Sequence, residues 1–241
     1  MEQLQTLRHL IQNSKRIVFF GGAGVSTESG IPDFRSDQGV FRAMEAHGHA
    51  PETLLSIDFF KQYPDVFYQY YRSLLLAPSA RPNEAHKALA RLEQQGKLSA
   101  VITQNIDGLH QAAGSQHVLE LHGSMLRNYC VRCRESFSLP DLLAQAGVPH
   151  CPCGGIIRPD IVMYGETLNS AVLASAMQEL RLADLLIVGG TSLVVYPAAG
   201  LIDHFRGGNL VLINKSATPC DYRARLVIHD AIGGVLGRAV E

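Results

Sequence analysis

Six short apolar runs, separated by helical patterns, constrain the fold of this chain most strongly. The runs cover residues 17–20, 99–103, 117–121, 184–189, 209–213 and 225–228. Amphipathic helical patterns cover 84–95, 170–181 and 196–205. Strands that are apolar throughout, rather than alternating, are typical of a parallel sheet that helices cover on both faces. The sequence therefore predicts an α/β protein with a doubly wound, Rossmann-like parallel sheet.

Two segments do not follow this alternation of strands and helices. Residues 37–83 hold helical and loop patterns, and residues 125–157 hold four of the five cysteines. We interpret them as a helical insertion and a zinc-binding module that together form a smaller lobe. The Rossmann-like domain would then consist of residues 1–36, 84–124 and 158–241. Ligands of such sheets bind beyond the carboxyl ends of the strands, where a small lobe can close over them.

The bulk composition narrows the class of protein. Of the 241 residues, 46% are hydrophobic and 18% are charged, and the formal net charge is −1. This balance implies no strong attraction to nucleic acid or to anionic membranes. The N-terminal segment has Leu4, Leu7 and Leu10 at helical spacing but no long apolar run, so we expect neither a signal peptide nor a membrane span. We expect a cytoplasmic monomer with no specific nucleic-acid partner.

The clustered cysteines suggest a metal site. Cys130 and Cys133 form a C-x-x-C pair, and Cys151 and Cys153 form a C-x-C pair, with seventeen residues between the two pairs. Four thiolates can close a tetrahedral zinc site with Zn–S distances of about 2.3 Å and no open position for water. Reduced structural cysteines and a redox pair are the alternatives, and His150 is a candidate substitute ligand.

The stretch GGAGVSTESGIPDFRS at residues 21–36 follows the first apolar run. A strand that runs into glycines is typical of phosphate sites, because glycine lets the backbone approach a pyrophosphate closely. Gly22 and Gly24 match the start of the G-x-G-x-x-G fingerprint, but Thr27 replaces its third glycine. A nucleotide site and a plain glycine-rich turn are both compatible with this pattern.

Polar residues follow several of the predicted strands. Gln104, Asn105, Ile106 and Asp107 come after the second strand, and His122 comes after the third. The amides and the carboxylate suit a carboxamide or ribose hydroxyls, and a neutral histidine can accept a proton. A turn with a helix cap, and a structural histidine, are the alternatives. The acidic residue that dehydrogenases carry about 20 residues past the glycines is not evident.

Together these motifs resemble the sirtuins, the NAD-dependent protein deacylases, in their bacterial form. The resemblance covers nearly the whole chain. It rests on GAGVSTESGIPDFRS at 22–36, TQNIDGLH at 103–110, LHG at 121–123, the paired cysteines, RPDIVMYGE at 158–166, GTSLVVYPAA at 190–199 and Asn214 at a strand end. It implies the Rossmann-like fold described above, NAD as co-substrate and a structural zinc ion held by the four cysteines.

The resemblance also implies roles for the matched residues. His122 would be the general base, and Asn105 and Asp107 would complete the catalytic set by positioning the nicotinamide ribose. The acyl oxygen of an acyl-lysine would attack that ribose as nicotinamide leaves, and lysine and O-acyl-ADP-ribose would be released. The NAD site would comprise Gly22, Ala23, Gly24, Thr27, Phe34, Arg35, Gln104, Asn105, Ile106, Asp107, Thr191, Ser192, Asn214, Lys215 and Ile232.

On the substrate side, the resemblance places a peptide as an added strand between segments 158–166 and 193–197. The contacting residues would be Val162, Tyr164, Gly165, Glu166, Val194 and Tyr196. Sirtuins that prefer acidic acyl groups carry a Tyr-x-x-Arg pair, but here the nearest register reads Tyr68-Gln69-Tyr70-Tyr71, with Arg72 one place late. We therefore expect acetyl or other short neutral acyl groups as substrates.

Three other functions are compatible with parts of the pattern. An ADP-ribosyltransferase or NAD hydrolase could use the same scaffold, but neither needs His122. A non-catalytic NAD-sensing module would not need the full set of polar residues at the strand ends. A dehydrogenase would need the missing acidic residue.

Overall fold

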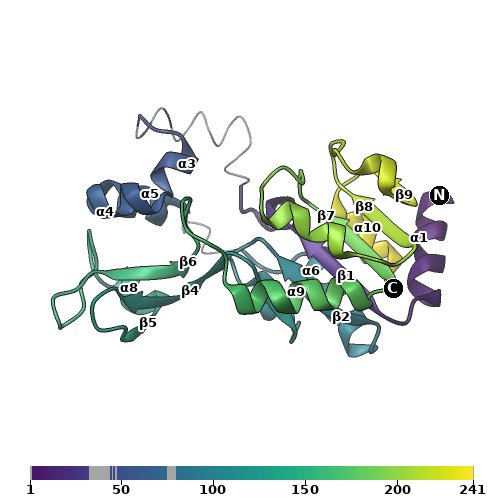
Figure 1. The fold of residues 1–241 in the computed structure, drawn as a ribbon, viewed down its shortest axis with the longest axis horizontal. Coiled ribbons are helices and arrows are strands. Elements are labelled where there is room, and N and C mark those ends of the chain that lie inside the picture. Colours follow the sequence, from purple (N-terminus) through teal and green to yellow (C-terminus); the bar gives the residue numbers. More distant parts are fainter. Residues whose placement is uncertain (1, 33–43, 45, 47, 75–79, 241) are drawn as a thin grey trace.

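The computed structural model describes residues 2–32, 44, 46, 48–74 and 80–240, and Figure 1 shows them as two lobes. The larger lobe contains a six-stranded sheet and both ends of the described chain, and the smaller lobe contains a three-stranded sheet and four of the described helices.

The large sheet confirms the predicted doubly wound architecture. Its strand order is β3-β2-β1-β7-β8-β9, and all neighbouring strands pair in parallel. Each predicted strand is present within two residues of its expected bounds. These strands are β1 (Ile17–Gly21), β2 (Leu98–Thr103), β3 (Val118–Glu120), β7 (Leu185–Gly189), β8 (Asn209–Ile213) and β9 (Leu226–Ile228). The chain winds outward in both directions from β1, so the switch point at which ligands bind lies between β1 and β7.

Helices cover both faces of this sheet. Ile17 and Phe19 of β1 pack into the same core as α1 (Glu2–Asn13), α6 (Glu84–Gln94) and α10 (Ile232–Ala239). Val18 and Phe20 point to the opposite face and share a core with α9 (Ser170–Leu182) and η3 (Ala198–His204). The structure differs from the prediction at residues 196–205, where the helix is a 3-10 helix that covers only Ala198–His204. Both faces of β1 are fully buried, which explains why its sequence is apolar throughout.

The small lobe is built as predicted from a cysteine-bearing module and a helical insertion. Its sheet has the order β5-β4-β6 and is antiparallel. The elements of this lobe are α3 (Pro51–Leu54), α4 (Ile57–Gln62), α5 (Pro64–Leu74), β4 (Gly123–Cys130), β5 (Ser136–Ser138), α8 (Leu139–Leu143) and β6 (Ile157–Ile161). Aromatic side chains of α4 and α5 share one hydrophobic core with the residues around the cysteines.

The predicted domain boundaries stay a prediction, and the small sheet crosses two of them, since Gly123 and Ser124 of β4 fall within the predicted 84–124 segment. We assigned residues 158–161 to the Rossmann-like domain, but β6 pairs with β4 in the small sheet. The two antiparallel strands bury a shared face only as a pair, so the small lobe extends to Ile161.

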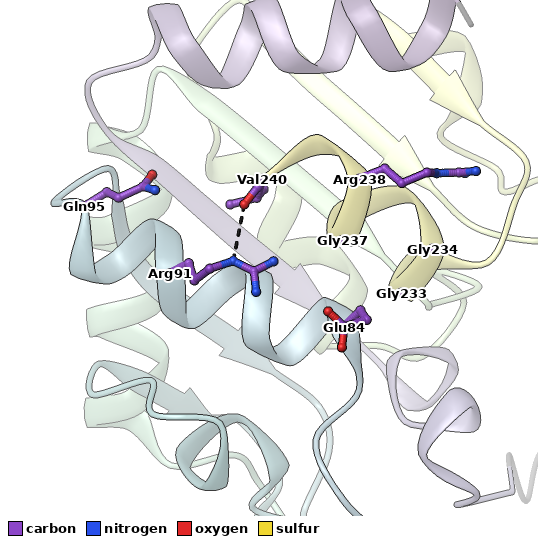
Figure 2. Close-up of a pocket in the computed structure, with 8 residues that line it drawn as sticks. All are labelled: Glu84, Arg91, Gln95, Gly233, Gly234, Gly237, Arg238 and Val240. Atoms are coloured by element: carbon purple, nitrogen blue, oxygen red, sulfur yellow. Dashed lines mark hydrogen bonds between the residues drawn. The ribbon is translucent and has the colours of Figure 1, made fainter.

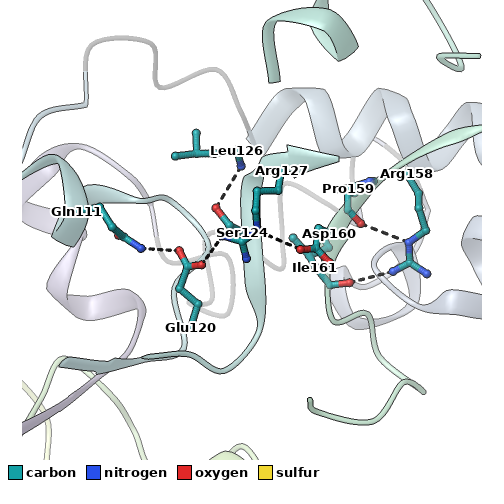
Figure 3. A network of polar contacts seen from close by, with 9 residues as sticks. All are labelled: Gln111, Glu120, Ser124, Leu126, Arg127, Arg158, Pro159, Asp160 and Ile161. Atoms are coloured by element: carbon teal, nitrogen blue, oxygen red, sulfur yellow. Dashed lines mark hydrogen bonds and ion pairs between the residues drawn. The ribbon is translucent and has the colours of Figure 1, made fainter. Parts of the chain in front are cut away.

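One ion pair joins the small sheet to the edge of the large one, and a second lies within the small sheet (Figure 3). Arg127 on β4 donates to Glu120 on β3 over 2.8 Å and to Asp160 on β6 over 3.1 Å. Glu120 also accepts a hydrogen bond of 2.8 Å from Gln111 of α7 (Leu109–Ala112). Because His122 lies between β3 and β4, this network helps to fix the segment that carries it. In the described part of the chain, none of the helices is long and apolar enough to cross a membrane.

Candidate active site

A cavity of about 590 Å³ lies where the two lobes meet, at the carboxyl ends of β1, β2 and β3. The large lobe contributes Ala23, Ser26, the segment 104–107 and His122. The small lobe contributes Leu55, Tyr71, Met125 and the segment 161–166, and Val195, Tyr196 and Pro197 close one side. The cavity thus brings together most of the predicted nicotinamide and substrate residues.

Three side chains form a hydrogen-bonded group in this cavity. Ser26 Oγ donates to Asp107 Oδ2 over 2.7 Å and accepts from Asn105 Nδ2 over 3.0 Å. Ser26 is only 1% exposed. Sequence reasoning did not single out Ser26, because serine is common in turns and its partner lies 81 residues away. Its place two residues after Gly24, in a loop at a strand end, was the available signal.

Asp107 lines the cavity and accepts hydrogen bonds on both of its carboxylate oxygens. Its Oδ1 accepts a hydrogen bond of 2.9 Å from the backbone N–H of Leu109 at the start of α7. Its Oδ2 is held by Ser26 in the cavity. The carboxylate is therefore anchored at the start of α7 by one oxygen while the other oxygen faces Ser26.

His122 is held in a defined tautomer. Its Nδ1 lies 2.9 Å from the carbonyl oxygen of Gln104. A carbonyl only accepts hydrogen bonds, so Nδ1 carries the hydrogen and the lone pair of the neutral ring lies on Nε2. The backbone carbonyl of His122 accepts from Val162 N over 2.9 Å, which ties the residue to a predicted substrate segment. A general base requires this tautomer of the neutral ring, because the lone pair on Nε2 can then accept a proton.

Two other histidines near Asp107 are buried. The rings of His86 and His110 lie 4.7 Å apart, centroid to centroid. Burial lowers the pKa of His86 to about 4, although the negative charge of Asp107 opposes the shift. Burial, followed by the neighbouring His86, lowers the pKa of His110 to about 3. Both rings are therefore neutral at pH 7 and add no positive charge beside Asp107.

The glycines after β1 are required by a close contact between two loops. Gly24 N donates to Gly190 O over 2.8 Å. A Cβ atom on Gly24 would lie 2.8 Å from Gly190 Cα, and one on Gly22 would lie 2.9 Å from Thr191 Cβ. The contact lets Thr191 Oγ1 accept from Gln104 Nε2 over 3.2 Å. These glycines therefore shape the loops, whatever their role toward a phosphate.

The predicted adenosine-side residues are not among the described residues that line this cavity. Asn214 and Lys215 follow β8, and Ile232 is the first residue of α10. The Ile232 side chain packs so close to Gly189 of β7 that a Cβ atom on this glycine would overlap the isoleucine. The Asn214 side chain donates to Ser216 O over 2.8 Å. The predicted residues that are absent from the described cavity lining are Gly22, Gly24, Thr27, Thr191, Ser192, Val194, Asn214, Lys215 and Ile232. Phe34 and Arg35 lie outside the described residues.

Of the predicted substrate residues, Val162, Tyr164, Gly165, Glu166 and Tyr196 line the cavity. Tyr164 N donates to Leu55 O over 3.0 Å, which ties this segment to the helical insertion. Val194 is 59% exposed and Tyr196 is 75% exposed, as a peptide-binding edge requires.

Glu166 has a structural partner. Both of its carboxylate oxygens accept hydrogen bonds of 2.8 Å from Arg158, and Glu166 Oε2 also accepts from Met163 N over 3.0 Å. Burial alone would raise the pKa of Glu166, but the hydrogen bonds and the charge of Arg158 lower it below its usual value. The carboxylate therefore holds the 158–166 turn in shape.

The four cysteines of the small lobe converge as predicted. Their sulfur atoms all lie within 4.8 Å of one another, with Cys130 and Cys153 at 3.4 Å and Cys133 and Cys151 at 3.5 Å. Tetrahedral zinc with Zn–S bonds of about 2.3 Å requires sulfurs about 3.8 Å apart, so this set fits the ion. A Cβ atom on Gly155 would lie 2.6 Å from Cys130 Sγ, which explains the glycine there. His150 Nδ1 instead donates to Val148 O, outside the group.

A second hollow, of about 600 Å³, lies between α6 and α10 (Figure 2). Arg91 on α6 donates from Nε to Val240 O over 3.3 Å at one side of it, and Gly233, Gly234 and Gly237 of α10 form much of its wall. None of the catalytic or peptide-contacting residues predicted from the sequence is among its described lining residues.

Comparison with known proteins agrees with this geometry. The Sir2 family model matches residues 22–197. The chain is 55% identical over 242 residues to an NAD-dependent protein deacetylase of Clostridium perfringens, covering 100% of this chain and 99% of the relative. It is 50% identical over 234 residues to an NAD-dependent protein deacetylase of Staphylococcus aureus, covering 97% of this chain and 96% of the relative.

Solved structures are similar over the same span. A structure from work on the mechanism and regulation of Sir2 enzymes matches with a TM-score of 0.89 and 38% identity, covering 99% of this chain and 96% of that chain. A Sir2 complex with p53 peptide and NAD+ matches with a TM-score of 0.86 and 40% identity, covering 98% of this chain and 96% of that chain. The likeness therefore includes both lobes and the cavity between them.

Proposed function

This chain belongs to the Sir2 family, and we propose from that premise how its own residues carry out NAD-dependent protein lysine deacetylation. In this reaction the acyl group of an acyl-lysine is transferred to ADP-ribose, and nicotinamide and O-acyl-ADP-ribose are released. NAD supplies the ribose carbon that exchanges nicotinamide for the acyl oxygen. The substrates are acylated proteins or peptides, as the p53-peptide complex of a similar Sir2 structure illustrates.

The observation that best supports the proposal is the placement of His122 beside the Ser26–Asn105–Asp107 group in one cavity. The group presents a hydroxyl, an amide and a carboxylate, which suit the hydroxyls and the carboxamide of a nicotinamide riboside. His122 accepts a proton at Nε2 from a ribose hydroxyl, since its Nδ1 hydrogen is already used by Gln104. Holding the reacting groups in this arrangement supplies the rest of the acceleration.

The cysteine group takes no part in the reaction. Four thiolates would hold a zinc ion with no open coordination position, so the ion would stabilise the small lobe only. That the protein acts as a monomer in the cytoplasm, without a specific nucleic-acid partner, stays a prediction.

Mass spectrometry of the products tests this function directly. The purified protein is incubated with NAD and an acetyl-lysine peptide, and we expect deacetylated peptide and O-acetyl-ADP-ribose in equal amounts. An NAD hydrolase would produce ADP-ribose with the peptide unchanged, and an ADP-ribosyltransferase would produce a protein that gains ADP-ribose. Either pattern would replace the deacetylase assignment.

We expect a preference for acetyl over succinyl peptides of at least about tenfold in kcat/KM. Arg72, the nearest cation to the expected register, donates to the carbonyls of Leu142, Gln145 and Gly147 at 3.4, 2.6 and 3.0 Å. None of the described residues that line the cavity is an arginine or a lysine. A buried carboxylate without a cation is costly, by several kcal/mol or more.

The preference is measured on one peptide sequence that carries either group, with product formation as the common readout. Desuccinylation at the rate of deacetylation would contradict the argument. The deacetylase function itself would be unaffected by that result.

A further inference from the structure

The cavity has one polar group at its apolar end that the reaction above does not use. Tyr71 on α5 lines the cavity, is 0% exposed, and its hydroxyl has no hydrogen-bond partner among the residues that the structure describes. Its ring is fixed, because it stacks on Phe67 with the ring centroids 5.6 Å apart and the planes 11° apart. The hydroxyl therefore has little freedom to turn toward solvent.

The neighbouring Tyr68 shows how a hydroxyl on the same helix is normally satisfied. Tyr68 is also 0% exposed, and its hydroxyl donates to the backbone carbonyl of Ile157. Buried hydroxyls in proteins nearly always have such a partner, because an unpaired one loses its hydrogen bonds to water without replacement. Because Tyr71 also lines the binding cavity, its unpaired buried hydroxyl suggests that a ligand supplies the partner.

The surroundings of Tyr71 limit what that ligand group can be. Leu55, Ile161 and Met163 line the same part of the small lobe, so an occupant is largely surrounded by apolar atoms. Burial raises the pKa of Tyr71, so the hydroxyl stays neutral and can donate. Arg72 is held by three carbonyls, so the described lining offers no counter-charge to an anion. A neutral, short acyl chain with one polar oxygen matches this environment.

We propose that Tyr71 selects short acyl groups that carry a hydroxyl, such as 3-hydroxybutyryl, by hydrogen bonding to that hydroxyl. The inference rests on the proposed deacylase function and names a substrate class for its acyl site. The hydroxyacyl group satisfies the buried tyrosine, whereas the plain acyl group of the same length leaves it unpaired.

The test compares kcat/KM for one peptide sequence bearing butyryl-lysine or 3-hydroxybutyryl-lysine, which differ by a single hydroxyl. For the unaltered protein we expect a ratio of about tenfold in favour of the hydroxylated group. In Tyr71→Phe the ratio should fall to about one, because only the hydroxyl is removed. The same variant should keep its melting temperature, since no hydrogen bond in the fold is lost, and its rate on an acetyl peptide serves as the reference for both acyl rates.

Tyr68→Phe is the matched control. It removes a buried hydroxyl three residues earlier on the same helix, but one that the fold uses. It should lower the melting temperature while keeping the tenfold ratio. A ratio near one in the unaltered protein, or a ratio that persists in Tyr71→Phe, would overturn the proposal while leaving deacetylation intact. Absence of turnover on every acyl peptide, acetyl included, would instead overturn the proposed function and this inference with it.

Discussion

Replacing His122 with alanine will lower kcat/KM for an acetyl-lysine peptide by about 10²–10⁴-fold, the usual contribution of a positioned general base. The residue is the histidine whose tautomer is fixed inside the cavity, through its Nδ1 contact with Gln104 O. Without the imidazole, the hydrogen-bonded trio offers only the Ser26 hydroxyl, the Asn105 amide and the Asp107 carboxylate, which already accepts from two donors. Steady-state kinetics at saturating NAD measure the loss.

The loss must come from chemistry and not from folding or NAD binding. His117→Ala is a matched control, because His117 Nδ1 also donates to a backbone carbonyl, that of Ser99 at 2.6 Å, at an exposed position outside the described cavity lining. We expect this variant to keep its activity. For His122→Ala, calorimetric titration should return an NAD affinity within a few-fold of the unaltered protein. A rate for His122→Ala equal to that of the unaltered protein would exclude the residue as the base.

The main features of the fold and of the cavity were predictable because they depend on local patterns. The central strands β1 and β7 of the large sheet are buried on both faces, and residues directly after parallel strands must meet at one edge. That geometry alone brings Gln104, Asn105, Asp107 and His122 into one cavity. Residues 158–161 were assigned to the wrong lobe because their place does not depend on a local pattern. They join the small sheet only because β6 pairs with β4, which is distant in sequence.

The details that the sequence could not predict are all pairings between distant residues. Ser26 is unremarkable until the fold places it against Asp107. Glu166 was assigned to substrate binding, yet both its oxygens are bound by Arg158. Gly22 and Gly24 were assigned to phosphate approach, yet the loop at Gly190 already requires them to lack side chains. In each case the residue type fits two roles, and only the partner distinguishes them.

Replacing Cys130 with serine will remove the zinc ion and lower the melting temperature of the protein by about 10 °C or more, because a structural zinc site contributes its binding energy to folding. Cys130 is the last residue of β4 and is 0% exposed, and its sulfur lies 3.4 Å from that of Cys153 in the loop before β6. The ion would therefore join the ends of the two strands that form most of the small sheet. Elemental analysis gives the metal content, with one zinc per chain expected before the substitution.

Cys220→Ser is the control for this substitution, since Cys220 is the one cysteine outside the metal-binding group and is only partly buried against the large-lobe core. It should keep one zinc ion per chain and nearly the same melting temperature. The small lobe also supplies Leu55, Tyr71 and the 161–166 segment to the cavity, so Cys130→Ser should raise KM for the peptide more than the dissociation constant for NAD. Purified protein without zinc, or a Cys130→Ser variant of unchanged stability, would refute the metal site. Either result would also refute the idea that the ion supports the small-lobe residues that line the cavity.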